Sequence, residues 1–161
     1  MKKNLNDILK VVGTVFAFLL VYRLFGQSGN FTPIFASAIL VPYITNNNYI
    51  KYLAPLSLMF ISDLFLGLYP EAPVVYTCIA FATWLSTVVS NKYYAVLGSI
   101  GVWHVLVNTM TASISHGYGP FTVEALTFDI KLLVSTLLYV GLYDYGKKLW
   151  QTRLQGLLLK Q

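Results

Sequence analysis

The chain alternates between long apolar segments and short stretches that are polar or contain glycine and proline. A helix that crosses a bilayer needs about 17–25 mostly apolar residues, and six segments are predicted to be such helices. Their expected bounds are about 8–25, 33–45, 50–68, 73–90, 93–112 and 127–145. The second segment contains Pro42 and is near the length of a re-entrant or interfacial helix. The pattern predicts an all-α membrane protein, a six-helix bundle forming one domain over residues 1–161.

Lysine and arginine are distributed unevenly between the two predicted sides of the membrane. With the N-terminus in the cytoplasm, every cation except Arg23 and Lys131 falls on the inner side. This asymmetry is the positive-inside rule, and it favours an even number of crossings with both termini cytoplasmic. The basic start could be misread as a signal peptide, but no small-residue cleavage site precedes Gly26. We therefore expect a retained helix.

Composition agrees with a membrane protein. Hydrophobic residues make up 57% of the chain and charged residues 11%, whereas soluble domains carry about 25% charged residues. The net charge of +5 does not indicate nucleic-acid binding, because the basic residues lie at predicted membrane edges. One cysteine excludes an internal disulfide. The chain has only two histidines and lacks a phosphate-binding G-x-x-x-x-G-K-[ST] loop. We expect no metal and no cofactor.

An acidic residue inside the third predicted span is the strongest functional signal. Asp63 lies in the outer third of the apolar run 50–68. A carboxylate at that depth costs about 2.5–3.5 kcal/mol on insertion scales, so it marks a candidate functional site. The alternative is a structural acid that is protonated or paired within the bundle. Arg23 and Lys131 are both predicted on the same side, and the sequence does not choose between them as its partner.

The fifth predicted span carries small and polar residues on one helical face. Gly101, His104, Asn108 and Thr111 recur at spacings of three and four. Such a face turns toward other helices or a cavity rather than toward lipid. His104 is either a ligand contact or proton carrier, or a member of an interhelical hydrogen bond. We expect it to line the floor of a pocket with Trp103 and Asn108.

Two predicted outer connections could contribute to a site. One is QSGNFTP at 27–33, and the other is SISHGYGPFTVE at 113–124. A loop of about twelve residues often serves as a lid or binding loop. We expect Asn30 to shape the first loop, and Tyr118 and Phe121 to cover a ligand. The alternative is an interfacial loop whose aromatic residues anchor it at the membrane surface.

Two short motifs carry a family resemblance. Asn30-Phe31-Thr32-Pro33 follows the arginine-bearing first segment, and SDLFLG at 62–67 comes about thirty residues later. Together they resemble a family of uncharacterised proteins assigned to transport. That family is related to the S-components, the substrate-binding subunits of energy-coupling-factor (ECF) vitamin transporters. The resemblance covers roughly residues 20–145. It carries over to Asn30, Pro33 and Asp63, and matches more loosely around Asn108 and Asp129.

The resemblance implies a six-helix protein that captures a vitamin or similar micronutrient near the outer membrane face. S-components pass their ligand on by docking to a membrane-embedded coupling subunit that works with ATPases, using small residues of the first helix. Here Gly13 and Ala17 form a small-xxx-small pair, which equally suits packing within the chain. A prokaryotic inner or plasma membrane also follows from the resemblance.

We therefore predict a substrate-binding transport protein that is not an enzyme, with a small molecule and the lipid bilayer as partners. The residues expected to contact the ligand are Arg23, Asn30, Asp63, Trp103, His104, Asn108, Tyr118, Phe121 and Asp129. A structural or accessory subunit of a larger membrane complex is the alternative. A small intramembrane enzyme ranks third, because no nucleophile motif such as G-x-S-x-G is present.

Overall fold

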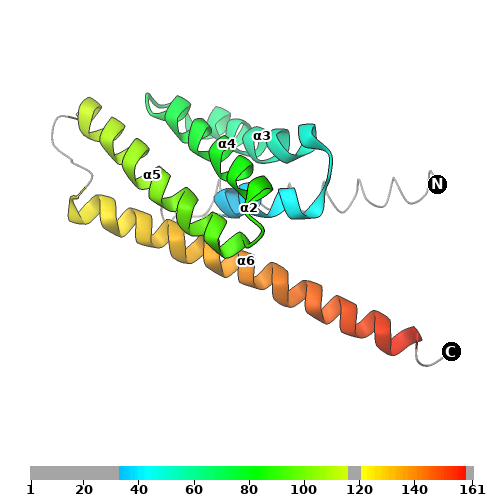
Figure 1. Ribbon diagram of the computed structural model, residues 1–161. Coiled ribbons are helices and arrows are strands. Elements are labelled where there is room, and N and C mark those ends of the chain that lie inside the picture. The colour runs from blue at the N-terminus through cyan, green and yellow to red at the C-terminus, as the bar shows by residue number, and fades with distance from the viewer. Residues whose placement is uncertain (1–32, 116–120, 159–161) are drawn as a thin grey trace.

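The computed structural model describes residues 33–115 and 121–158, which form a bundle of α-helices. The helices are α2 (Pro33–Ile44), α3 (Asn48–Leu66), α4 (Ala72–Val88), α5 (Lys92–Ser115) and α6 (Val123–Leu158). The short helix α2 lies in the middle and contacts each of the other four (Figure 1). The 36 residues of α6 extend about 54 Å at 1.5 Å per residue, and its C-terminal part runs past the rest of the bundle (Figure 1).

The all-α prediction is confirmed, but the six predicted spans are not. Among the described residues, three helical segments are long and apolar enough to cross a membrane: Asn48–Leu66, Lys92–Ile114 and Val123–Thr152. Helices α2 and α4 are apolar but shorter. The 12 residues of α2 reach about 18 Å, well short of the roughly 30 Å hydrocarbon core. The span expected at 8–25 lies outside the described residues.

The ends of α3 follow from local backbone chemistry. At its start, the side chain of Asn47 accepts hydrogen bonds from the backbone N–H groups of Tyr49 and Ile50, at 2.9 and 3.3 Å. At its end, Gly67 has φ 98°, and its N–H donates to the carbonyl of Asp63 at 2.8 Å. A positive φ favours glycine. The last residue of the SDLFLG motif therefore has a structural reason to be glycine.

Several polar residues lie inside the bundle, while many large apolar residues are exposed on its surface. Thr83 and Ser86 are buried on α4, and their hydroxyls donate to backbone carbonyls one turn earlier, at 3.1 and 2.9 Å. On α3, Leu53, Phe60 and Leu64 are between 48% and 61% exposed. Because lipid solvates apolar side chains and polar groups must be satisfied internally, this arrangement is typical of an integral membrane protein.

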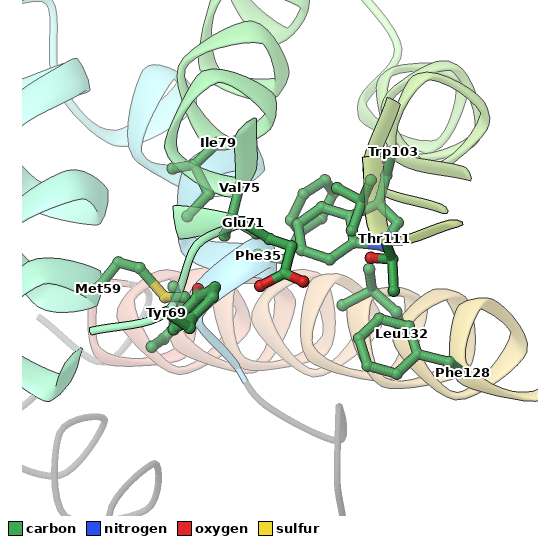
Figure 2. Close-up of a pocket in the computed structure, with 12 residues that line it drawn as sticks. Phe35, Met59, Tyr69, Glu71, Val75, Ile79, Trp103, Thr111, Phe128 and Leu132 are labelled. Carbon is green, nitrogen blue, oxygen red and sulfur yellow. The ribbon is translucent and has the colours of Figure 1, made fainter. Parts of the chain in front are cut away.

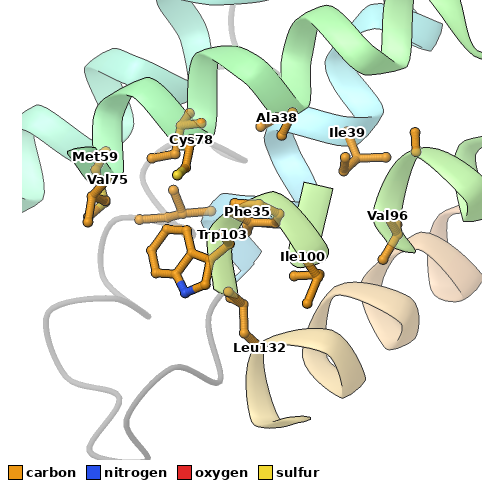
Figure 3. Packing of buried hydrophobic residues seen from close by; sticks show 14 of the residues in the cluster. Phe35, Ala38, Ile39, Met59, Val75, Cys78, Val96, Ile100, Trp103 and Leu132 are labelled. Atoms are coloured by element: carbon orange, nitrogen blue, oxygen red, sulfur yellow. The ribbon is translucent and has the colours of Figure 1, made fainter. Parts of the chain in front are cut away.

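The core is built from small and branched apolar residues where α2, α4 and α5 meet. Ala38, Ala82 and Ala95 are completely buried, and small side chains of this kind let helix backbones approach closely. Figure 3 shows Phe35 and Ile39 of α2 among residues of α4, α5 and α6. This packing fixes α2 and holds the facing walls of α4 and α5 in place.

The end of the bundle at the start of α5 is tied together by charge and aromatic contacts. Lys92 Nζ lies 2.6 Å from Asp144 Oδ1, and the Tyr93 hydroxyl donates to Asp144 Oδ2 at 2.9 Å. The same ammonium lies 5.6 Å from the ring centroid of Tyr43 and 5.7 Å from that of Tyr143. These contacts join α2, α5 and α6, since each contributes a residue.

Candidate functional site

Three polar side chains of α5 and α6 meet inside the bundle and form what we call the polar cluster: His104, Asn108 and Asp129. His104 Nδ1 lies 2.6 Å from Asp129 Oδ2, and Asn108 Nδ2 donates to the same oxygen at 2.8 Å. Asn108 is 8% exposed and Asp129 is 6% exposed. Two residues of the polar stripe predicted on the fifth span, His104 and Asn108, therefore contact Asp129 of the sixth.

The side chains of His104 and Asn108 share one acceptor atom, Asp129 Oδ2. In the tautomer with the proton on Nδ1, His104 donates to Asp129 Oδ2, since a carboxylate oxygen accepts. Asn108 Nδ2 lies 3.0 Å from the same Nδ1, but two donors cannot bond each other. Its hydrogen bond therefore goes to Asp129. His104 keeps Nε2 as the ring nitrogen that is not engaged with the carboxylate.

One oxygen of Asp129 has an unusual environment. Oδ1 is buried and has no hydrogen-bond partner among the described residues, whereas Oδ2 receives both donors of the polar cluster. An unpaired buried acceptor costs free energy, about 1–3 kcal/mol. Such groups are rare in native structures and point to a functional reason or to an additional donor.

Two adjoining cavities lie beside the polar cluster. The first, the aromatic cavity, has a volume of about 360 Å³ and is lined by Ile34, Phe35, Met59, Tyr69, Glu71, Val75, Ile79, Trp103, Val107, Thr111, Phe128 and Leu132. The second, the amide cavity, has a volume of about 280 Å³ and is lined by Val107, Asn108, Thr111, Thr122, Glu124, Ala125 and Phe128. They share Val107, Thr111 and Phe128, so the two cavities adjoin, and the polar cluster contributes the Asn108 carboxamide to the wall of the amide cavity.

Aromatic rings form much of the wall between these features. The Trp103 ring meets Phe35 edge-on at 5.5 Å and stacks on Phe128 at 6.2 Å between centroids. The indole is 6% exposed, and its Nε1 has no hydrogen-bond partner in the described part of the chain. Figure 2 shows Trp103, Phe35 and Phe128 around the aromatic cavity, with the Glu71 carboxylate projecting between them and Tyr69.

The predicted contact Asp63 lies apart from the polar cluster. It is completely buried on α3 and accepts a hydrogen bond from the Tyr76 hydroxyl of α4 at 2.8 Å. It lines neither cavity, although Met59, one turn earlier, lines the aromatic cavity. Within the described residues it forms no ion pair with Lys131, which is exposed on α6. This placement favours the structural alternative for Asp63.

The structure brings some of the other predicted residues together. His104, Asn108 and Asp129 are joined by hydrogen bonds, and Trp103 and Asn108 line the aromatic and the amide cavity, respectively. His104 was expected to line the floor of a pocket, but neither His104 nor Asp129 lines either cavity. Phe121 is 82% exposed, and its ring lies edge-on to His104 at 5.8 Å. The remaining predicted positions lie outside the described residues: Gly13, Ala17, Arg23, Asn30 and Tyr118.

Sequence reasoning missed several lining residues. The aromatic cavity is lined by Phe35, Tyr69, Glu71 and Phe128. In the sequence, these residues look like ordinary residues of apolar segments, loops or helix boundaries. Tyr76 could have been found from the helical hairpin, because residues 63 and 76 lie six and seven positions from the centre of the α3–α4 connection. In an antiparallel pair, such positions stand opposite each other.

Comparison with models of protein families assigns the chain to a family. A family model described as a family of unknown function matches residues 2–157. The chain belongs to DUF6580. No curated protein and no solved structure matches it. Membership of DUF6580 assigns no activity to the chain.

The DUF6580 chain offers hydrogen-bonding and carboxylate groups rather than a metal centre. Within residues 33–115 and 121–158, no three His, Cys, Asp or Glu side chains come together as they would around a metal ion. Cys78 is buried in the apolar core. The described residues of the site supply hydrogen-bonding groups, aromatic rings and carboxylates.

Proposed function

We propose that this protein is a substrate-binding transport protein, similar to an S-component, that captures a small micronutrient or vitamin-like molecule in the two adjoining cavities. The observation that carries the proposal is the polar cluster: Asn108 and Asp129 are buried, His104 is partly exposed, and Asn108 lines the amide cavity. Intramembrane ionisable residues are costly and usually functional. A recess with convergent polar groups is the usual form of a small-molecule site.

The position of the cavities supports capture from one side of the membrane. Their walls come from the start of α2, the C-terminal half of α3, the α3–α4 connection, the first half of α4, the middle and C-terminal part of α5 and the first turns of α6. The opposite end of the bundle carries Lys92 and Asp144. Under the positive-inside rule, the Lys92 end faces the cytoplasm. The cavities then lie toward the outer face.

In this proposal, α2 and α4 also lie within the bilayer as short apolar helices packed on the three longer candidate spans. The protein binds and releases its ligand without changing it, so it is not an enzyme and needs no cofactor. Energy for uptake comes from a membrane-embedded coupling subunit with ATPases, or uptake is passive. The proposed location is a prokaryotic inner or plasma membrane.

The first experiment is native mass spectrometry of the protein, gently solubilised from its own host, with a matched pair of variants. Thr111 lines both cavities, whereas Thr109 is exposed on the same helix. Thr111→Phe fills the recess, and Thr109→Phe adds the same ring outside it. We expect a small-molecule adduct on the wild type and on Thr109→Phe that is lost from Thr111→Phe.

A second measurement connects binding with transport. Once the adduct mass identifies the ligand, its radiolabelled form is followed into cells that express each variant. We expect uptake with Thr109→Phe and at most background uptake with Thr111→Phe. A stoichiometric membrane partner without any small-molecule adduct would contradict the proposal and support an accessory subunit.

A further inference from the structure

We propose that the ligand of the aromatic cavity is a compact organic cation whose positive charge lies beside Glu71. This inference rests on the proposed function, because it names the chemical class of the molecule held at that site. Its basis is the juxtaposition of one carboxylate and four aromatic side chains around a cavity of about 360 Å³.

Glu71 places a carboxylate in the wall of the aromatic cavity, and this carboxylate does not cap helix α4. It precedes α4 at the N-cap position, yet its side chain makes no capping hydrogen bond. Within residues 33–115 and 121–158, this carboxylate has no hydrogen-bond or ion-pair partner. Figure 2 shows it projecting among the lining residues instead of turning back to the helix. A half-buried carboxylate without a partner favours a cation next to it.

The rings around the carboxylate suit the same kind of ligand. Phe35, Tyr69, Trp103 and Phe128 all line the aromatic cavity. The faces of aromatic rings are electronegative, and cages of aromatic rings are a common way of recognising quaternary ammonium groups. A carboxylate supplies the net charge that such a cage lacks. Together they recognise an organic cation better than a neutral molecule of equal size.

The described residues that line the two cavities carry no positive charge. Among the described residues that line the two cavities, the charged ones are Glu71 and Glu124, and both are acidic. Charge interactions are stronger in a partly buried site than in water. Glu71 is half-buried and Glu124 is exposed, so the described charges favour a cation over an anion most strongly in the aromatic cavity.

Trp103 adds one further requirement. Its buried Nε1 has no hydrogen-bond partner among the described residues, although the ring lines the aromatic cavity. An indole N–H is a donor only. We therefore expect the cation to carry an acceptor atom, such as a hydroxyl or ring nitrogen, on an apolar or aromatic body.

The test uses isothermal titration calorimetry of the full chain in a neutral maltoside detergent, with two probes of similar size and opposite charge. Phenyltrimethylammonium is the cation and benzenesulfonate is the anion. We expect the cation to bind at least about tenfold more tightly, and Glu71→Gln to weaken its binding about tenfold. Glu71→Asp keeps the charge and should retain most of the affinity.

Two further variants separate the aromatic contribution from misfolding. Tyr69→Leu should weaken cation binding several-fold, whereas Tyr69→Phe keeps the ring and should change it less than about twofold. Each variant is first checked for an unchanged melting temperature. Addition of phosphatidylcholine, with phosphatidylglycerol as control, shows whether a lipid headgroup competes as the source of the cation.

The outcomes distinguish this inference from the proposed function. If benzenesulfonate binds as tightly as the cation, and Thr111→Phe abolishes both, the cavity binds ligands but the inference is wrong. A native adduct identified as neutral or anionic would overturn it in the same way. If neither probe binds and no native adduct is found, the proposed function itself fails.

Discussion

Asn108 of α5 pairs with Asp129 of α6 in the same antiparallel register as Tyr93 pairs with Asp144. Tyr93 lies fifteen residues before Asn108, and Asp144 lies fifteen residues after Asp129. Both pairs are hydrogen-bonded, at 2.8 and 2.9 Å. Each pair is equally far from the midpoint between residues 118 and 119. Helices α5 and α6 therefore keep one antiparallel register over most of α5, which sets the polar cluster at a fixed depth.

This register predicts different coupling energies at its two ends. In a double-mutant cycle, Asn108→Ala and Asp129→Ala should show a coupling of about 0.5–2 kcal/mol, because their hydrogen bond is buried. Tyr93→Phe with Asp144→Asn is the control cycle. It should give less than about 0.5 kcal/mol, because both residues are solvent-accessible. Denaturant unfolding in bicelles measures both cycles. No coupling in the buried pair would contradict the assigned network.

The contact between Tyr76 and Asp63 leads to a prediction about stability. Tyr76→Phe removes the hydroxyl that donates to the buried carboxylate at 2.8 Å. The free energy of unfolding should fall by about 1–3 kcal/mol, because the acceptor loses a partner. Ligand affinity should change less than about twofold, since neither residue lines a cavity. If Tyr76→Phe lowered ligand affinity as much as it lowered the free energy of unfolding, Asp63 would be part of the binding site after all.

The positions of the helices could be predicted from hydropathy because apolar runs in this chain coincide with helices. The expected segments 50–68 and 73–90 agree closely with α3 (Asn48–Leu66) and α4 (Ala72–Val88). The sixth was expected to end near residue 145, but α6 continues to Leu158. Hydropathy marks where a helix leaves the membrane rather than where it ends. The polar KKLWQTRLQ sequence that follows still favours helix.

The candidate site could be predicted only in part. The spacing of His104 and Asn108 on one face was visible in the sequence, and so was the intramembrane position of Asp63. The aromatic cavity was not, because its walls come from separate helices and a connection. Nothing local distinguishes Glu71 or Phe128 from ordinary boundary residues. Predicting them requires the packing of α2 against α4, α5 and α6.

Gly67 provides a test of backbone strain. Its φ of 98° disfavours other residues, although a Cβ there would meet nothing within 4 Å. Gly67→Ala should therefore destabilise the protein by about 1 kcal/mol through the backbone alone. Gly141→Ala is the matched control, because that position lies within α6 and is equally open. It should be neutral or stabilising. Equal effects in the two variants would contradict this explanation.

The orientation of the bundle can be tested by cysteine labelling in intact cells. Cys78 is buried and is replaced by serine to give a background without reactive thiols. Glu124→Cys introduces a thiol near the start of α6, and Lys147→Cys introduces one on its exposed distal part. If the cavities face outward, a membrane-impermeant maleimide should label Glu124→Cys and should spare Lys147→Cys until the cells are permeabilised.

The reverse labelling pattern would place the cavities on the cytoplasmic side. Capture of a ligand from outside would then be excluded, even if the ligand binds to the purified protein. Labelling of both positions in intact cells would contradict a bilayer crossing between them. That crossing is expected because α6 contains a 30-residue apolar candidate span, longer than the roughly 20 residues that a bilayer requires. The two-position experiment therefore tests the membrane path of α6 and the direction of binding together.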